Sequence, residues 1–191
     1  MRRRRKAGRK AVKAQRRNAP KATRPRSEKA DTRLTAELKE AREHQAATAE
    51  VLQVIRNSRT NIQPAFDAIV RVGARLFQDS AVAIAIPDGG MIKAISIADS
   101  NPERAEAWRR VFPVPLTREY VTGVAILDHR IVDIPDVQKA SKEQTAGRRN
   151  FVTLGYRGVT VVPLMRDEEA IGALCVIRVA PGSLTKSQVF Y

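Results

Sequence analysis

Hydrophobic residues between positions 34 and 56 recur at alternating spacings of four and three, and charged side chains fill most positions between them. This heptad spacing predicts an amphipathic helix over residues 34–58. The residues of the predicted seam are Leu34, Leu38, Ala41, Gln45, Thr48, Leu52 and Ile55. Gln45 and Thr48 are polar, which weakens a coiled coil but can determine its register. Two interpretations are open: the seam pairs with a second copy of the chain, or it packs against the chain's own domain.

Residues 62–191 show a helical pattern followed mainly by strand patterns. Apolar residues from Phe66 to Phe77 recur at helical spacing, after a break in which Thr60 or Asn61 can cap the helix. A second helix is predicted at residues 102–110, and strands at residues 80–87, 91–98, 131–134, 158–164 and 170–179. The stretch GVAILDHRIVDIPDV is interpreted as part of this strand pattern, and the segment after it, through Asn150, as a polar loop. This order of elements predicts an α+β fold rather than alternating β–α–β units.

Three local features predict how the strands are arranged in the sheet. Asp88, Gly89 and Gly90 join the first two strands as a hairpin turn. In the first strand, alanines alternate with Val82, Ile84 and Ile86, which predicts that a helix or a ligand approaches its small-residue face. The last strand, IGALCVIRV, is apolar almost throughout, so we expect it to be covered on both faces and to be central in the sheet.

The positive charge of the chain is concentrated at its start. Residues 1–33 contain 15 Lys or Arg against two acidic residues, whereas the rest is close to neutral. This tail has a single branched aliphatic residue, Val12, and no aromatic residue, so we expect it to be disordered. Like charge of this kind attracts nucleic acid, anionic lipid or acidic proteins, without sequence specificity and with strong salt dependence. The alternative is a solvated arm without a dedicated partner.

Several features predict a soluble, cytoplasmic protein. No apolar stretch follows the initial arginines, as a secretory signal requires, and no apolar run reaches the roughly 20 residues that span a bilayer. The single cysteine, Cys175, excludes an internal disulfide and agrees with a reducing compartment.

Few residues are candidates for chemistry. His44 lies in the predicted helix and lacks the sequence context of a phosphoacceptor, and His129 is far from it in the chain. Two such histidines do not suggest a metal cluster or a catalytic triad. Cys175 is interpreted as a small core residue, with a redox role as the alternative. Asp128, Asp133 and Asp136 could suggest a cation site, although Asp136 is better explained as the cap of a turn. We therefore predict no enzyme activity and no metal.

Residues 48–187 resemble the GAF domains at the input end of bacterial sensor histidine kinases and nucleotide cyclases. The motifs that carry the resemblance are VTGVAILDHRIVDIPDV and GYRGVTVVPLMRDEEAIGALCVIRV. The leader RRNAPKA and the helix LTAELKEAREHQAATAEVLQVI are similar to the start of one proteobacterial group of such kinases. The resemblance implies an antiparallel sheet with helices on both sides and a ligand pocket over one face. The pocket residues that it implies are Trp108, Arg109, Phe112, Val124, Leu127, Arg149, Tyr156 and Val161.

The resemblance also implies a function. The expected role is a non-catalytic sensory module of a two-component system, which binds a small ligand or a protein partner and relays the change through a dimeric stalk helix. The salt-bridge motif NKFDE of cyclic-nucleotide-binding relatives is absent, and the ligand or cofactor stays unknown. A GAF domain continues after Leu184 into a long helix, whereas SLTKSQVFY stops within two turns. We therefore expect an uncovered apolar face, with marginal stability or dimerisation through it.

Overall fold

The computed structural model describes residues 28–57, 61–139 and 145–185 of the chain. The predictions for residues 1–27 lie outside this part. By its internal contacts the chain divides into two units, residues 1–38 and residues 39–191. Helix α1, Glu28–Asn57, begins earlier than the predicted residue 34, so it includes residues 28–33 of the predicted basic tail. Its first residues, EKADTR, contain no Pro or Gly, so nothing in them ends the helix before the seam.

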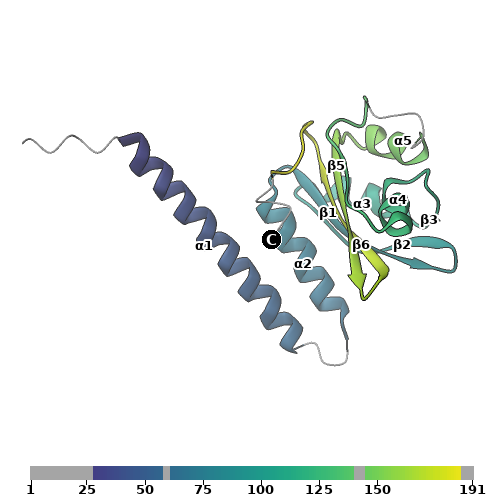
Figure 1. Ribbon diagram of the computed structural model, residues 1–191, viewed down its shortest axis with the longest axis horizontal. Helices are drawn as coiled ribbons and strands as arrows, with labels where there is room; N and C mark the ends of the chain where they lie inside the picture. The colour runs from purple at the N-terminus through teal and green to yellow at the C-terminus, as the bar shows by residue number, and fades with distance from the viewer. Residues whose placement is uncertain (1–27, 58–60, 140–144, 186–191) are drawn as a thin grey trace, which may run out of the picture. The chain divides into compact units, whose positions relative to one another are not determined.

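One antiparallel sheet of six strands forms the centre of residues 39–191 (Figure 1). The strands lie in the order β3-β2-β1-β6-β5-β4. Their bounds are β1 Ser80–Asp88, β2 Met91–Asp99, β3 Val114–Pro115, β4 Val132–Ile134, β5 Gly158–Arg166 and β6 Glu169–Arg178. The two short strands, β3 and β4, stand at the edges, and the predicted central strand, β6, pairs with β1 and β5. The central place of the last strand is thus confirmed.

Helices cover both faces of the sheet, as the α+β prediction required (Figure 1). Helix α2, Gln63–Leu76, packs on one face, where Val70 meets Val82, Ile84 and Val176. We call this the α2 face. The opposite face, the α4 face, carries α3 (Pro102–Arg109), α4 (Val121–Asp128) and α5 (Thr145–Thr153).

The small residues of β1 lie on the α4 face. Ala81 and Ala83 are almost completely buried in the core cluster that contains Trp108, Val124 and Ala125. The larger residues Val82 and Ile84 lie on the α2 face. The helix that packs closely on β1 is α2, on the face of Val82 and Ile84, whereas α4 packs mainly on β5 and β6, so the predicted close approach of a helix to the alanine face is not confirmed.

Turn chemistry determines the hairpin register. Gly89 and Gly90 have φ values of 57° and 79° and form a two-residue loop between Asp88 and Met91, which are paired. Two consecutive residues with positive φ are typical of the tight hairpin turn that suits twisted strands. The second hairpin turns at Asp167, with φ of 56°, and Glu168.

Two helices and one short strand were not predicted. The stretch from Val121 to Asp128 is helix α4 rather than strand, and helix α5, Thr145–Thr153, begins inside the loop that was expected through Asn150. All residues from Val121 to Ile126 are buried, so α4 has no polar face and no 3.6-residue periodicity that sequence analysis could detect. The short strand is β3, which pairs with β2 at two positions only.

Candidate functional site

An aromatic cluster lies on the α4 face of the sheet. Trp108 of α3 stacks on Phe151 of α5 with ring centroids 5.2 Å apart. The same ring makes edge contacts with Phe112 at 5.7 Å and with Tyr156 at 6.0 Å. Trp108 is only 5% exposed and Tyr156 is fully buried. Aromatic pairs of this geometry add to the stabilisation from burial, so they hold α3 and α5 around one point.

The indole N–H of Trp108 is buried without a hydrogen-bond partner among the described residues. An unpaired buried donor costs about 1–3 kcal/mol, which a ligand or a water molecule can recover. Trp108 lines a small cavity of about 20 Å³, which we call the inner cavity. Its other lining residues are Val111, Phe112, Val114, Tyr120, Val121, Thr122, Gly147, Asn150 and Phe151. This volume is sufficient for about one water molecule or one polar group of a ligand.

A polar network supports the cluster from the end of β2. The Asp99 carboxylate accepts hydrogen bonds from Tyr156 Oη at 2.5 Å and from Arg104 Nε and Nη2 at 2.7 and 2.6 Å. Its side chain is fully buried. Burial by itself raises the pKa of Asp99, but the hydrogen bonds from Arg104, Asn101 and Tyr156 outweigh this effect, and the pKa is lowered. Burial and the Asp99 carboxylate raise the pKa of Tyr156, so the phenol stays protonated and donates.

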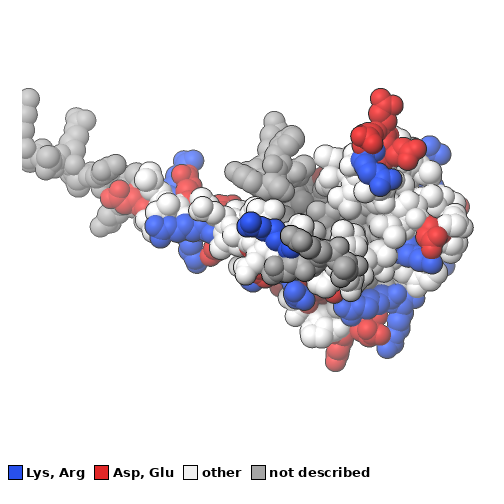
Figure 2. Space-filling view, turned by 90° about the horizontal axis from the view of Figure 1, so that it is seen from below, with Lys and Arg blue, Asp and Glu red and all other residues white. Residues whose placement is uncertain are grey.

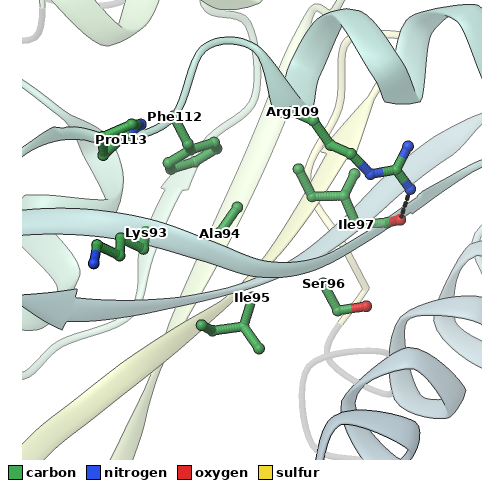
Figure 3. A pocket seen from close by; sticks show the side chains of 8 residues that line it. All are labelled: Lys93, Ala94, Ile95, Ser96, Ile97, Arg109, Phe112 and Pro113. Carbon is green, nitrogen blue, oxygen red and sulfur yellow. Dashed lines mark hydrogen bonds between the residues drawn. The ribbon is translucent and has the colours of Figure 1, made fainter.

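A larger pocket of about 320 Å³, the outer pocket, lies along β2 (Figure 3). Its lining residues are Lys93, Ala94, Ile95, Ser96, Ile97, Arg109, Phe112 and Pro113. Phe112 and Arg109 approach the strand from the side of Ala94 and Ile97, whereas Ile95 and Ser96 point the other way (Figure 3). Arg109 Nη2 donates to the carbonyl oxygen of Ile97 at 2.8 Å. The pocket thus combines an apolar surface with the Arg109 guanidinium, which is held at one end.

The structure separates the predicted pocket residues into three groups. Trp108 and Phe112 line the inner cavity, and Phe112 and Arg109 line the outer pocket. Val124, Tyr156 and Val161 are core residues, and none of them lines either cavity. Leu127, which is 37% exposed, and Arg149, which is also exposed, line neither cavity.

Sequence reasoning missed the polar lining of the inner cavity. Thr122 and Asn150 come from α4 and α5, the two helices that were not predicted. Tyr120 stands directly before α4, and its side chain is half-buried. An aromatic or polar residue beside an apolar run is too common a pattern to identify these positions without the tertiary structure.

The remaining chemical candidates are dispersed. His129 is exposed at the end of α4, where its φ is 51°. Asp128, Asp133 and Asp136 do not converge, since each has its own partners: Arg118, Thr160 and Arg157. Asp136 Oδ1 also accepts the Gln138 N–H at 3.1 Å, which confirms the turn interpretation. Among the described residues, no three His, Cys, Asp or Glu side chains are grouped so that they could hold a metal ion.

Cys175 is a buried core residue of β6. Its sulfur lies 3.6 Å from the hydroxyl oxygen of Thr122. Burial raises the pKa of the thiol to about 11, so at neutral pH it is almost entirely protonated. Because the thiolate is the reactive form, this environment favours the core interpretation over the redox one.

The predicted seam of α1 is exposed along its whole length. All seven seam residues are exposed, and Leu34 and Leu38 retain 62% and 54% of their accessible surface. Thr48 and Leu52 nevertheless line a groove together with residues of α2, so both interpretations of the seam stay open. Ala47, on a neighbouring stripe, is 3% exposed instead. Within residues 39–191, α1 and α2 line an apolar groove of about 330 Å³ that reaches Val82 and Leu174, and Glu50 pairs with Arg75 at 2.8 Å.

The surface of the described residues carries both signs of charge. Lys and Arg side chains are interspersed with Asp and Glu on the face shown in Figure 2. This distribution agrees with the nearly balanced charge of the sequence after residue 33. None of the helices within the described ranges is both long and apolar enough to cross a membrane.

These features define a small α+β domain with a buried aromatic site on one face of its sheet. The family model of the GAF domain matches residues 61–189, and the chain belongs to this family of ligand-binding regulatory modules. A comparison with curated protein sequences found no match.

Three solved structures illustrate the shared fold. The free methionine-R-sulfoxide reductase of Neisseria meningitidis has a TM-score of 0.59 at 18% identity, covering 78% of this chain and 80% of that one. The GAF domain of the Acinetobacter phosphoenolpyruvate-protein phosphotransferase has a TM-score of 0.58 at 16% identity, covering 79% and 84%. The GAF domain of the corresponding Coxiella burnetii protein has a TM-score of 0.57 at 13% identity, with the same coverage. At these identities the likeness establishes the fold, which both enzymes and regulatory domains share.

Proposed function

We propose that this protein is a non-catalytic sensory GAF module, as at the input end of a sensor histidine kinase. It binds a small ligand on the α4 face and relays the change through α1 to a second copy or to a signalling partner. The observation that carries the ligand-binding part is that Trp108, which lines the inner cavity, has a buried indole N–H without a partner among the described residues. A buried donor without a partner is rare, and a bound acceptor explains it.

Binding rather than catalysis is supported by the chemistry of the cavity. Its described lining residues include no Cys, His, Asp or Glu, so they offer no conventional nucleophile with a base. The nearby Cys175 thiol is buried, and its raised pKa disfavours the reactive thiolate. The module acts in the cytoplasm. Ligand binding changes its conformation, and this change alters the state of the partner.

The relay through α1 is supported by its exposed seam. Apolar side chains at heptad spacing over several turns are typical of a helix that pairs with another. The polar seam residues Gln45 and Thr48 limit the strength of this pairing. A weak pairing has nearly equal alternatives, which a ligand can shift by a small difference in binding free energy.

Replacing Leu38 by Glu is expected to convert a dimer into a monomer. The substitution puts a charge into the apolar seam of both copies, where it faces its own equivalent. Ala36→Glu is the matched control, because it adds the same charge at an exposed position of α1 outside the seam. Sedimentation equilibrium of the wild type and both variants measures the association. If the three proteins associate equally, or all are monomers, the seam is not the dimer interface.

A second candidate function is supported by the concentration of Lys and Arg before residue 34. In this alternative the tail carries the protein to a polyanion, nucleic acid or an anionic membrane. Binding to double-stranded DNA of random sequence is then expected to fall steeply with salt and to disappear when residues 1–27 are deleted. Equal DNA binding by the full chain and the deletion variant would reject the alternative, and the truncated protein keeps α1 for the sensory function.

A further inference from the structure

We propose that the outer pocket and the inner cavity form one site for a small organic anion that contains a planar ring, and that Phe112 is the gate between them. The inference rests on the proposed function, since it names the class of ligand that the α4 face would bind. It depends on three observations: a residue shared by both cavities, a guanidinium in the outer one and, lining the inner one, a tryptophan whose buried indole N–H has no partner among the described residues.

Phe112 lines both cavities. Its side chain is only half-buried, and its ring meets Trp108 edge-on at 5.7 Å. The inner cavity alone, about 20 Å³, is too small for an organic molecule, whereas the outer pocket, about 320 Å³, reaches the size of a small-molecule site. A change of the Phe112 rotamer removes the side chain that separates the two spaces, and a partly exposed ring can change rotamer on a short timescale.

The charged side chains of the outer pocket are both cations. Arg109 keeps Nη2 on the Ile97 carbonyl oxygen, and its Nη1 lies 3.5 Å from Glu106 in a pair whose side chains are about half exposed. An exposed pair of this kind is weak, so a ligand carboxylate or phosphate can compete for the guanidinium. Lys93 lies at the other end of the pocket (Figure 3). Its ammonium group pairs with Asp88. No acidic residue lines the pocket within the described part of the chain.

The lining of the inner cavity indicates that the ligand also carries a planar ring. Its aromatic lining, Trp108, Phe112, Phe151 and Tyr120, favours the face or edge of a planar ring. The Trp108 N–H requires an acceptor atom, and Thr122 and Asn150 are polar side chains in the same lining. A ligand with its anionic group on Arg109 and its ring in the place of the Phe112 side chain satisfies both ends of the site.

Trp108 is the single tryptophan of the chain, so its fluorescence reports directly on the inner cavity. The probes are benzoate and phenyl phosphate, which combine a ring with an anion, phenol, which has the ring alone, and inorganic phosphate, which has the charge alone. We expect a saturable fluorescence change with benzoate or phenyl phosphate. Phenol and inorganic phosphate are expected to bind at least about tenfold more weakly, because each loses one set of contacts. The comparison of benzoate with phenyl phosphate shows which anionic group the site prefers.

Two arginine variants test whether Arg109 binds the anionic group of the ligand. Arg109→Gln is expected to raise the Kd of the preferred probe at least about tenfold, because a charge-assisted hydrogen bond is lost. Arg110→Gln is the control: Arg110 is adjacent and exposed, it lies 3.5 Å from the same Glu106 carboxylate, and it does not line the pocket. Thermal melting of both variants shows that they fold. Phe112→Ala removes the side chain between the two cavities and is expected to speed the association of the probe.

The possible results distinguish the class of ligand from ligand binding on the α4 face itself. Equal binding of phenol and benzoate, or equal Kd values for the Arg109 and Arg110 variants, would overturn the anionic class and leave ligand binding on the α4 face intact. If no probe changes the Trp108 fluorescence in the wild type or in Phe112→Ala, the joined site is wrong. The relay through α1 is tested independently by the seam variants.

Discussion

Replacing Asp99 by Asn is expected to lower the free energy of unfolding by about 3–5 kcal/mol, because it removes the acidic partner of a buried ion pair and leaves Arg104 in place. The Asp99 side chain is fully buried and that of Arg104 is 19% exposed. Asn is neutral and cannot accept the two Arg104 hydrogen bonds and the Tyr156 hydrogen bond as the carboxylate does. The variant therefore leaves a guanidinium largely buried without its counter-ion.

The same carboxylate links stability to pH. The pKa of Asp99 is lower in the folded protein than its ordinary value, so the folded state favours the ionised form. Its contribution is fully present above the unfolded pKa of about 3.9 and is lost as the pH falls through the folded value. The wild type is thus expected to lose stability below pH 4 faster than Asp99→Asn does.

Urea denaturation followed by Trp108 fluorescence measures both effects, at pH 7 and at a series of values between 5 and 2.5. The control is Asp88→Asn, since Asp88 pairs with Lys93 and both side chains are more than half exposed. Removing such a pair changes stability by less than about 1 kcal/mol. Similar losses in the two variants at pH 7 would mean that the Asp99 network does not stabilise the fold.

Replacing Gly123 by Ala is expected to cost about 3 kcal/mol or more of stability, because the buried helix α4 has no space for a methyl group at this position. A Cβ atom on Gly123 would lie 2.0 Å from the carbonyl oxygen of Thr117 and 3.0 Å from its carbonyl carbon. Both are backbone atoms, so no side-chain rotation relieves the overlap. Helix α4 or the segment around Thr117 must move, and both border the inner cavity through Tyr120 and Thr122.

Gly147→Ala is the matched control for this prediction. Gly147 is also buried in a helix, α5, but an added Cβ would meet its nearest atoms at 3.5–3.6 Å, an ordinary packing distance. Ala is favoured over Gly within helices by about 0.5–1 kcal/mol, so this variant is expected to be as stable as the wild type or slightly more stable. The urea unfolding midpoints of the two variants are compared. A Gly123 variant as stable as the Gly147 variant would show that α4 can shift without cost.

Much of the fold was predictable because its signals are local. Two glycines and an Asp define the first hairpin, and an uninterrupted apolar strand has to be central. The alternation of alanines with larger residues in β1 separated the two faces of the strand, which lie in different core clusters. The family could also be predicted, since its motifs are continuous stretches of sequence, and the match to residues 61–189 confirms it.

The site was predictable only in part. Trp108 and Phe112 were predicted to line a pocket, and they do line the inner cavity. Leu127 and Arg149 were predicted as well, but a change of a strand into helix α4 and of a loop into helix α5 turns both outward. Thr122 and Asn150 reach the cavity for the same reason.

The sequence by itself determined the family, the hairpins and their turns, the central strand and the heptad seam, because spacing and turn chemistry act between near neighbours in the chain. Only the tertiary structure decided which face of α1 stays exposed, that Asp99 meets Tyr156 and Arg104, and that the Trp108 N–H has no partner in the described part of the chain. These properties depend on segments far apart in sequence. Burial, which makes their polar contacts strong or costly, arises only when those segments pack together.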